Sequence, residues 1–377
     1  MATAMYIHIP FCEHICYYCD FNKFFIQNQP VDDYIEALNK EINENISRTH
    51  PPFQSIYIGG GTPTALSANQ LEKLLTNVFE RISVHPEQLE FTVEMNPGDA
   101  DKNKLKLLRD FGVNRLSIGV QSFHDDMLKK IGRGHTASDA RKTVSFAQET
   151  GFKNISIDLM YGLPGQTMTM WQETISEALQ LEVQHMSAYS LLLETNTMFY
   201  NWYRKGELQL LSEDTEADMY EYLVEKLSVH GYEAYELSNF AKPGFESRHN
   251  QTYWKNNHYY GFGAGAHGYV NGIRYENIKP LPHYIEALKK NESPIKEQHQ
   301  VTKKEMMEEE MFMGLRMSKG VSQKLFYEKY QEKMEEIFGK QINRLLEERL
   351  VEWKDDSLSL TPKGKLLANE VFEAFLL

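Results

Sequence analysis

Short apolar runs alternate with longer amphipathic stretches from the start of the chain to about residue 230. An apolar run bounded by turn residues predicts a β-strand, and apolar positions three and four residues apart predict a helix. The expected strands cover residues 5–9, 55–58, 91–95, 115–120, 154–160 and 185–192. Helical patterns separate them, one opening at Val31 and another after Ser67, the expected N-cap. Strands that alternate with helices predict an α/β fold with a parallel sheet.

The pattern changes near residue 301. Helices are expected over residues 303–316, 322–330 and 334–349, followed by a hairpin over residues 350–360 and a last helix from Pro362. Helices followed by a hairpin resemble a winged helix. A DNA-reading module would normally be basic, whereas acidic residues slightly outnumber basic ones here. We therefore interpret this part as a structural or partner-docking domain.

These patterns divide the chain into three expected parts. Residues 1–235 form the α/β domain, with a cysteine-containing loop at residues 11–21. Residues 236–300 form a connecting region that is rich in aromatic residues and glycine. Residues 301–377 form the helical, winged-helix-like domain.

The composition narrows the class of protein. The chain has 377 residues, of which 41% are hydrophobic, and this is enough for a large packed core. A net charge of −13 argues against a general nucleic-acid binder, because that affinity comes mostly from Lys and Arg. No apolar run is long enough to span a bilayer, and the first residues do not resemble a signal peptide. We therefore expect a cytoplasmic protein, and contact with a membrane surface stays open.

All three cysteines lie in one short loop after the first strand, at Cys12, Cys16 and Cys19. Thiolates are soft ligands that suit iron–sulfur clusters, zinc and copper(I). Three thiolates on a cubane cluster would leave one iron open, whereas His14 could complete a four-ligand zinc site, so zinc remains an alternative. An odd cysteine count in a long chain without a secretion signal argues against a disulfide framework.

The C-x3-C-x2-C spacing, with the aromatic Tyr18 before the last cysteine, resembles the cluster loop of the radical S-adenosylmethionine (SAM) enzymes. The resemblance implies a [4Fe-4S] cluster on the three cysteines. It also implies that SAM chelates the fourth iron and is cleaved to a 5′-deoxyadenosyl radical by an electron from the cluster. The six expected strand–helix units resemble the open (β/α)6 partial barrel of that family.

Polar and glycine residues follow or end several expected strands, where parallel α/β folds place their chemistry. Gly59, Gly60 and Gly61 followed by Thr62-Pro63 resemble the GGGTP segment of the family, which contacts the amino group of SAM. A glycine triplet alone more often makes a tight turn. An acid such as Asp158 inside an apolar strand needs a partner. By resemblance to the subfamily of oxygen-independent coproporphyrinogen III oxidases, the expected SAM contacts are Tyr6, Tyr18, Gly60, Gly61, Thr62, Glu94, Gln121, Arg133 and Asp158.

Two departures separate the chain from the oxidases of that subfamily. The oxidases carry a further cysteine two residues after the third cluster cysteine, where this chain has Phe21, and they extend well before the cluster loop. Both differences match instead the HemW-type branch of haem chaperones, which lies in the same subfamily. We therefore do not expect coproporphyrinogen oxidation, although the radical SAM core leaves open whether the protein is an enzyme.

A second motif supports the chaperone branch. The segment from His249 to Trp254 fits the H-N-x-x-Y-W haem-binding motif of that branch, and the haem residues it implies are His249, Asn250, Tyr253 and Trp254. An imidazole can ligate haem iron, and aromatic rings can pack on the macrocycle. An isolated histidine beside aromatic residues is more often a hydrogen-bonded core residue. His267, in a glycine-rich stretch, is a rival axial ligand.

We therefore expect a haem chaperone that binds haem and passes it to an unidentified acceptor protein. The expected cofactors are a [4Fe-4S] cluster and SAM, with an electron donor as a further partner and no nucleic acid. The alternative is a radical SAM enzyme that decarboxylates coproporphyrinogen III or a related tetrapyrrole. A structural zinc protein is a third possibility.

Overall fold

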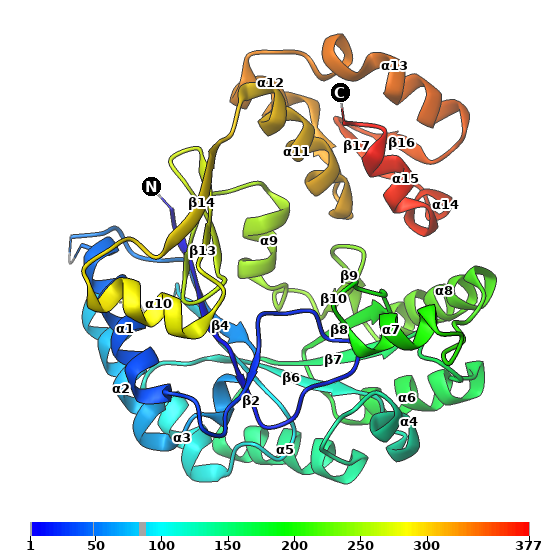
Figure 1. Cartoon of the computed structure of the whole chain (residues 1–377). Helices are drawn as coiled ribbons and strands as arrows, with labels where there is room; N and C mark the ends of the chain where they lie inside the picture. The colour runs from blue at the N-terminus through cyan, green and yellow to red at the C-terminus, as the bar shows by residue number, and fades with distance from the viewer. Residues whose placement is uncertain (1, 48, 83–87, 377) are drawn as a thin grey trace.

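The computed structural model describes residues 2–47, 49–82 and 88–376. Residues 1, 48, 83–87 and 377 lie outside this description. The outer limits of the first and last expected domains, residues 1 and 377, are among them. The chain forms an α/β body, and a second, mainly helical unit lies above one side of it (Figure 1).

A run of parallel strands forms the centre of the α/β body, as the sequence predicts. The neighbouring strands, in sheet order, are β1 (Ala4–Ile9), β4 (Ser55–Gly60), β5 (Glu90–Met95), β6 (Arg115–Gln121), β7 (Ile155–Tyr161) and β8 (His185–Ser190). Each of these pairs is parallel. Sequence order therefore equals spatial order, which is the arrangement of an open partial barrel. The α/β partial-barrel prediction is confirmed.

Helices follow the strands and cover the outer face of the barrel (Figure 1). They are α1 (Val31–Asn45), α2 (Ala68–Arg81), α3 (Lys102–Asp110), α4 (Asp125–Lys130), α5 (Ala137–Thr150), α6 (Met168–Gln180) and α8 (Glu213–Val229), with a 3-10 turn η1 (Pro63–Ala65). The short α7 (Met198–Arg204) lies instead against the cysteine loop, where Phe199 N donates to the Tyr17 carbonyl. Helix α2 begins where the sequence predicts, because Ser67 and Gln70 form a capping box.

The barrel strands alternate between an apolar outer face and a polar inner face. On β4, Ile56 and Ile58 pack into the main apolar core. Tyr57, between them, lines a cavity together with Ser117 of β6 and Asp158 of β7. Because successive strand residues point to opposite faces, the helices cover the apolar side and the polar side faces the barrel interior. The interior is therefore built to hold polar groups.

Residues 236–300, expected as a connecting region, extend the same sheet at both edges. Strand β11 (Tyr259–Phe262) pairs in parallel with β1, and β12 (His267–Val270), β13 (Ile273–Asn277) and β14 (Ile295–Gln300) continue outward from it. At the other edge, β10 (Asn239–Ala241) pairs with β8, and β9 (Glu233–Ala234), which lies just before this region in the sequence, pairs with β10. Strand β11 pairs with β1 at the far end of the sequence, so no local pattern marks it. Strands β12 and β13, by contrast, form a hairpin through Asn271-Gly272, a turn signal that sequence reasoning missed. Two helices, α9 (Arg248–Trp254) and α10 (Leu281–Lys289), belong to the same part.

The C-terminal unit has its own apolar core, which includes Phe326, Phe338 and Phe375. Its elements are α11 (Lys303–Arg316), β15 (Val321–Ser322), α12 (Gln323–Tyr330), α13 (Met334–Glu347), β16 (Val351–Lys354), β17 (Ser357–Leu360), α14 (Pro362–Leu366) and α15 (Ala368–Glu373). The helices and the hairpin agree with the prediction. The expected last helix is two helices, because the backbone at Leu367 leaves the helical region.

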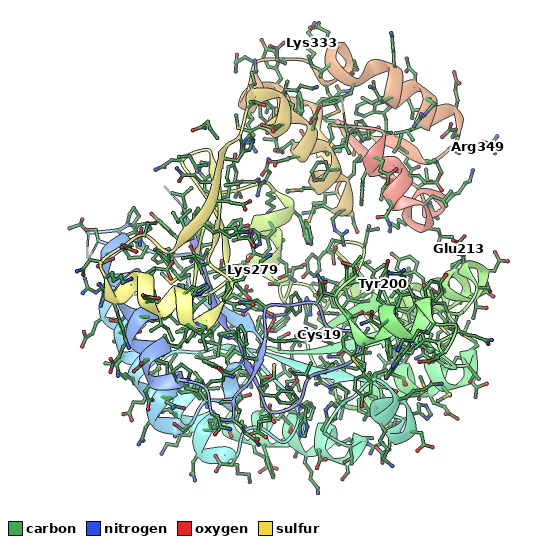
Figure 2. The ribbon with its side chains drawn as sticks, in the orientation of Figure 1. Cys19, Tyr200, Glu213, Lys279, Lys333 and Arg349 are labelled. Carbon is green, nitrogen blue, oxygen red and sulfur yellow. The ribbon has the colours of Figure 1, made fainter. Side chains whose placement is uncertain are left out.

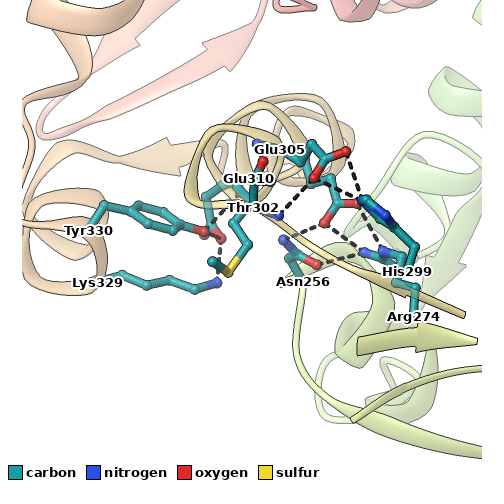
Figure 3. A network of polar contacts seen from close by, with 10 residues as sticks. Asn256, Arg274, His299, Thr302, Glu305, Glu310, Lys329 and Tyr330 are labelled. Carbon is teal, nitrogen blue, oxygen red and sulfur yellow. Dashed lines mark hydrogen bonds and ion pairs between the residues drawn. The ribbon is translucent and has the colours of Figure 1, made fainter. Parts of the chain in front are cut away.

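Charged and polar side chains join the sheet to the C-terminal unit (Figure 3). Arg274 of β13 makes two bonds to the Glu309 carboxylate of α11, at 2.9 and 2.8 Å, and a third to the Asn256 side chain at 3.0 Å. Asn256 also donates to Glu309, at 3.2 Å. These contacts hold α11 against the barrel extension. No helix in the described ranges is both long and apolar enough to cross a membrane.

Candidate functional site

The three cysteines face one large cavity at the C-terminal ends of the barrel strands. Strand β2 (Phe11–Cys12) pairs with β3 (Phe24–Phe25), and the loop between them carries Cys16 and Cys19. All three thiols are free, and all three residues line a cavity of about 1450 Å³. Figure 2 shows Cys19 near the centre of the molecule, with Tyr200 of α7 close above it in this view. Tyr200 lines the same cavity.

Hydrogen-bond donors point at two of the sulfur atoms. The Thr62 hydroxyl donates to Cys12 Sγ at 3.7 Å, and Arg133 Nη1 donates to Cys16 Sγ at 3.4 Å. Burial raises the pKa of the Cys12 thiol to about 11, and the bond from Thr62 acts in the opposite direction. Three thiols around one cavity, with donors that favour thiolates, fit a three-cysteine cluster site. Within the described ranges, no three His, Cys, Asp or Glu side chains are arranged to hold a single metal ion.

Asn96 links these donors, although the sequence analysis did not select it. Its Nδ2 donates to the Thr62 hydroxyl at 2.8 Å, and its Oδ1 accepts from Arg133 Nη2 at 2.6 Å. Arg133 also donates to the Gly119 carbonyl. The available signal was position, because Asn96 follows the third expected strand directly.

The glycine segment packs directly against the cysteine loop. Gly61 N donates to the Ile9 carbonyl at 2.9 Å, and Thr62 N donates to the Phe11 carbonyl at 2.7 Å. A Cβ at Gly61 would lie 2.8 Å from each of these carbonyl oxygens. Gly60 has a φ of +111°, a conformation that favours glycine. The end of β4 therefore lies against the start of the cluster loop only because these residues lack side chains.

Two half-buried carboxylates lie inside the barrel. Glu94 Oε1 accepts from the Tyr57 hydroxyl at 2.5 Å, and Glu94 Oε2 accepts from Gly60 N at 2.9 Å. Asp158 accepts from the Ser117 hydroxyl, at 3.3 and 3.4 Å to its two oxygens. Burial raises the pKa of both carboxyl groups.

The cation Arg115 partly offsets the effect of burial on these carboxyl groups, because its charge lowers the pKa of both Glu94 and Asp158. It is buried and lines the same cavity. Sequence reasoning missed it as a site residue. A charged residue that opens an otherwise apolar strand was the signal that could have found it.

The structure brings almost all of the expected SAM contacts to this cavity. Those that line it are Tyr18, Gly60, Gly61, Thr62, Glu94, Gln121, Arg133 and Asp158. Gln121 has a φ of +65° at an irregularity between β6 and β7. Tyr6 lies elsewhere. Its hydroxyl bonds His8 Nδ1 at 2.9 Å, and its ring stacks on that of Tyr57 with the ring centroids 6.2 Å apart. Tyr6 therefore supports a residue that lines the cavity and does not line it itself.

The H-N-x-x-Y-W segment forms α9, and its histidine lies inside the barrel. His249 Nδ1 bonds the Ser55 hydroxyl at 2.9 Å, and Nε2 bonds the Tyr253 hydroxyl at 2.8 Å. Burial lowers the pKa of His249 to about 3, so the ring is neutral at neutral pH. Both ring nitrogens have partners in this conformation, so His249 would have to leave one of them to ligate iron.

The other motif residues have different surroundings. Asn250 lines the large cavity. The Trp254 ring lies under the guanidinium of Arg316 on α11, 4.4 Å from its central carbon. Tyr253 and Trp254 line a second, smaller pocket of about 260 Å³. The motif therefore connects the barrel interior, the cavity and the C-terminal unit.

The rival ligand His267 lies on β12, with its side chain 63% exposed and Nε2 3.6 Å from a Glu276 oxygen. Neither His267 nor His249 lines the large cavity, whereas His14 of the cysteine loop does.

Comparison with known proteins identifies the class and then the family. Residues 6–178 match the radical SAM superfamily, and residues 301–367 match the HemN C-terminal domain. The solved structure of coproporphyrinogen III oxidase (HemN) from Escherichia coli superposes with a TM-score of 0.86, covering 99% of this chain and 90% of that one. Its sequence identity is 23%, so this likeness shows the fold alone. The fold and the family match define a radical SAM protein.

The curated relatives specify the branch. The "Heme chaperone HemW" of Bacillus subtilis is 50% identical over 99% of both chains. The protein of the same name from Lactococcus lactis is 49% identical, over 100% of this chain and 97% of its own. The chain belongs to the HemW family of radical SAM proteins. Membership in the superfamily implies a [4Fe-4S] cluster and SAM.

Proposed function

We propose that this protein binds haem in the large cavity and passes it to an acceptor protein. The observation that carries this proposal is the extent of the cavity, which runs from the three thiols to Asn250 of the motif helix and on to the C-terminal unit. One space thus contacts the expected cluster loop, the expected haem motif and the second unit. The names of the full-length relatives support haem as the cargo.

We also propose which residues hold the cofactors. Cys12, Cys16 and Cys19 ligate three irons of a [4Fe-4S] cluster, which supplies the electron for reductive SAM cleavage when it is bound. Thr62 and Arg133 stabilise the thiolates at Cys12 and Cys16 by donating hydrogen bonds. The proposed SAM contacts are Thr62 and Arg133 themselves, together with Tyr18, Gly60, Gly61, Glu94, Gln121 and Asp158, with Tyr6 acting through Tyr57. An electron donor to the cluster is a further proposed partner.

For haem, we propose that α9 forms one side of the site. Asn250 contacts the cargo directly, and Trp254 and Tyr253 hold the helix in place. His249 acts as axial ligand only after it releases Ser55 or Tyr253. His14, which already lines the cavity, and the exposed His267 are the competing ligands.

The test is a haem titration of the anaerobically reconstituted protein, followed by optical spectroscopy. Wild type should bind one haem saturably. The variants His249→Ala, His14→Ala and His267→Ala should identify the ligand, since loss of an axial imidazole changes the coordination of the iron and with it the Soret band. Absence of saturable binding by wild type would contradict the proposal. So would anaerobic conversion of coproporphyrinogen III propionates to vinyl groups, because that reaction defines the alternative enzyme.

A further inference from the structure

The walls of the large cavity carry opposite charges. The wall formed by the C-terminal unit carries Arg316 of α11 and Lys363 and Lys365 of α14, with Glu370 as its acid. The facing wall at the start of α8 carries Glu213, Asp214 and Glu216 (Figure 2 labels Glu213). Opposite walls of opposite sign would orient a ligand that has charge at one end.

The three cations on the first wall are not equally available. Arg316 is engaged by the buried Glu236 carboxylate, 3.3 Å away. Lys363 Nζ donates to the Glu348 carbonyl at 3.2 Å, which leaves its positive charge without a carboxylate. Lys365 Nζ has no hydrogen-bond or ion-pair partner among residues 2–47, 49–82 and 88–376. Lys365 is therefore the cation on this wall that can accept an anionic ligand at the lowest cost.

Lys365 is also partly removed from solvent. Burial lowers the pKa of its ammonium, and the charge of Lys354 acts in the same direction. The Glu352 carboxylate acts in the opposite direction, but it is paired with Lys354 at 2.8 Å. An anion bound beside Lys365 would offset both the burial and the repulsion from Lys354.

Large apolar side chains lie exposed around the same cavity. Leu192 is 67% exposed and Tyr203 is 48% exposed on the barrel side, and Leu366, next to Lys365, is 39% exposed. All three line the cavity. Exposed apolar surface inside a cleft is typical of a binding site for an apolar ligand. Haem combines a flat apolar macrocycle with two propionate carboxylates at one edge, so both features match it.

We propose that Lys365, with Lys363 beside it, binds the propionate carboxylates of haem. Haem then enters the cavity with its propionate edge toward α14 and away from the acidic start of α8. This inference rests on the proposed function and specifies which residues of that site recognise the cargo.

The test compares two ligands with three proteins. The ligands are haem and haem dimethyl ester, in which both carboxylates are blocked. The proteins are full-length, reconstituted wild type, Lys365→Met and the control Lys340→Met, which removes an exposed lysine of α13 that does not line the cavity. Optical titration gives each Kd. We expect Lys365→Met to bind haem about tenfold more weakly, the usual scale for a charge-assisted hydrogen bond.

The ester separates carboxylate recognition from general damage. Wild type should bind the ester at least as weakly as Lys365→Met binds haem, and the loss of affinity caused by Lys365→Met should be smaller with the ester than with haem. Lys340→Met should behave as wild type, and Lys365→Arg should restore most of the haem affinity. Circular dichroism checks that each variant is folded.

Three outcomes would count against the inference in different ways. Equal haem affinity of wild type and Lys365→Met overturns it while the proposed function stands. An equal loss of haem and ester affinity in Lys365→Met overturns it as well, because the carboxylates would then not be what Lys365 recognises. Failure of wild type to bind either ligand overturns the proposed function itself.

Discussion

The ring of His249 stacks on the ring of Tyr57 inside the barrel, with centroids 5.1 Å apart and planes inclined by 25°. The Tyr57 hydroxyl donates to Glu94, and the other oxygen of Glu94 accepts from Gly60 N. The histidine of the expected haem motif is thus two side chains away from the glycine segment expected to contact SAM. This continuous contact provides a physical route between the two proposed sites.

The first prediction tests that route. Tyr57→Phe removes the hydroxyl that fixes Glu94 while leaving the stack with His249 in place. We expect SAM affinity to fall about fivefold, which corresponds to the loss of one hydrogen bond of about 1 kcal/mol. Equilibrium dialysis with the reconstituted protein measures it. The control is Tyr253→Phe, which removes a hydroxyl from His249 but none from Glu94. Equal SAM affinity of Tyr57→Phe and wild type would contradict the route.

The second prediction concerns stability. His249→Ala leaves the Ser55 and Tyr253 hydroxyls without their ring partner and opens a cavity in a buried stack. We expect the free energy of unfolding to fall by about 3 kcal/mol, from the unpaired groups and the cavity together. His267→Ala, at an exposed ring, should change it by less than about 0.5 kcal/mol. Urea denaturation measures both, and similar values for the two variants would mean that the motif histidine is not a structural residue.

The third prediction concerns the junction between β4 and the cluster loop. Gly61→Ala places a Cβ against the backbone of Ile9 and Phe11, which cannot move independently of β1. We expect a loss of about 2 kcal/mol of stability, typical of an overpacked site, and lower iron content after reconstitution. Gly339→Ala is the matched control, because its Cβ would meet nothing within 4 Å inside α13. That change should stabilise the protein by about 0.5–1 kcal/mol. The reverse ranking of the two variants would refute the packing argument.

The fourth prediction concerns pH. Glu41 accepts from Asn277 Nδ2 at 2.6 Å, from Gly263 N at 2.9 Å and from the Tyr284 hydroxyl at 2.5 Å. Burial raises its pKa to about 7, above the value of an unfolded chain. The folded state therefore holds the Glu41 proton more tightly than the unfolded chain does. Its contribution to the free energy of unfolding is fully present below about pH 4.5 and is lost as the pH rises through 7.

Comparison of wild type with Glu41→Gln isolates this contribution from other titrating groups. Between pH 8 and pH 6, wild type should gain about 1.4 kcal/mol of unfolding free energy relative to Glu41→Gln. The control is Glu80→Gln on α2, an exposed residue that is not among the groups that shift the Glu41 pKa, and it should show no such pH-dependent difference from wild type. Urea denaturation at the two pH values measures it, and a constant difference between wild type and Glu41→Gln would show that Glu41 ionises normally.

Local patterns predicted much of the fold. The central strands are apolar on one face and bounded by turn residues, so their positions agree with the structure to within about two residues. Helix α11 has the expected limits, because Thr302 and Glu305 form a capping box. The edge strand β11 was missed for a different reason. Strand β11 pairs with β1 across most of the barrel sequence, and no local pattern encodes a partner that distant.

The candidate site shows the same division. The cysteine spacing and the polar residues at strand ends point to one edge of the sheet, and the structure gathers most of them around one cavity. The positions of Tyr6 and His249, by contrast, depend on which residue each ring packs against. Tyr57 contacts both of them, and that fact follows only from the three-dimensional arrangement.

The place of β1 between β11 and β4 also has a consequence for biosynthesis. At about 5–20 residues per second, roughly 13 to 50 s separate the emergence of β1 from that of β11. During that interval the nascent chain presents the N-terminal strand with one edge uncovered, next to three free thiols. An uncovered strand edge invites pairing with other chains. A translation product that stops before Tyr259 would keep that edge permanently open, so aggregation of such truncated chains is the expected result.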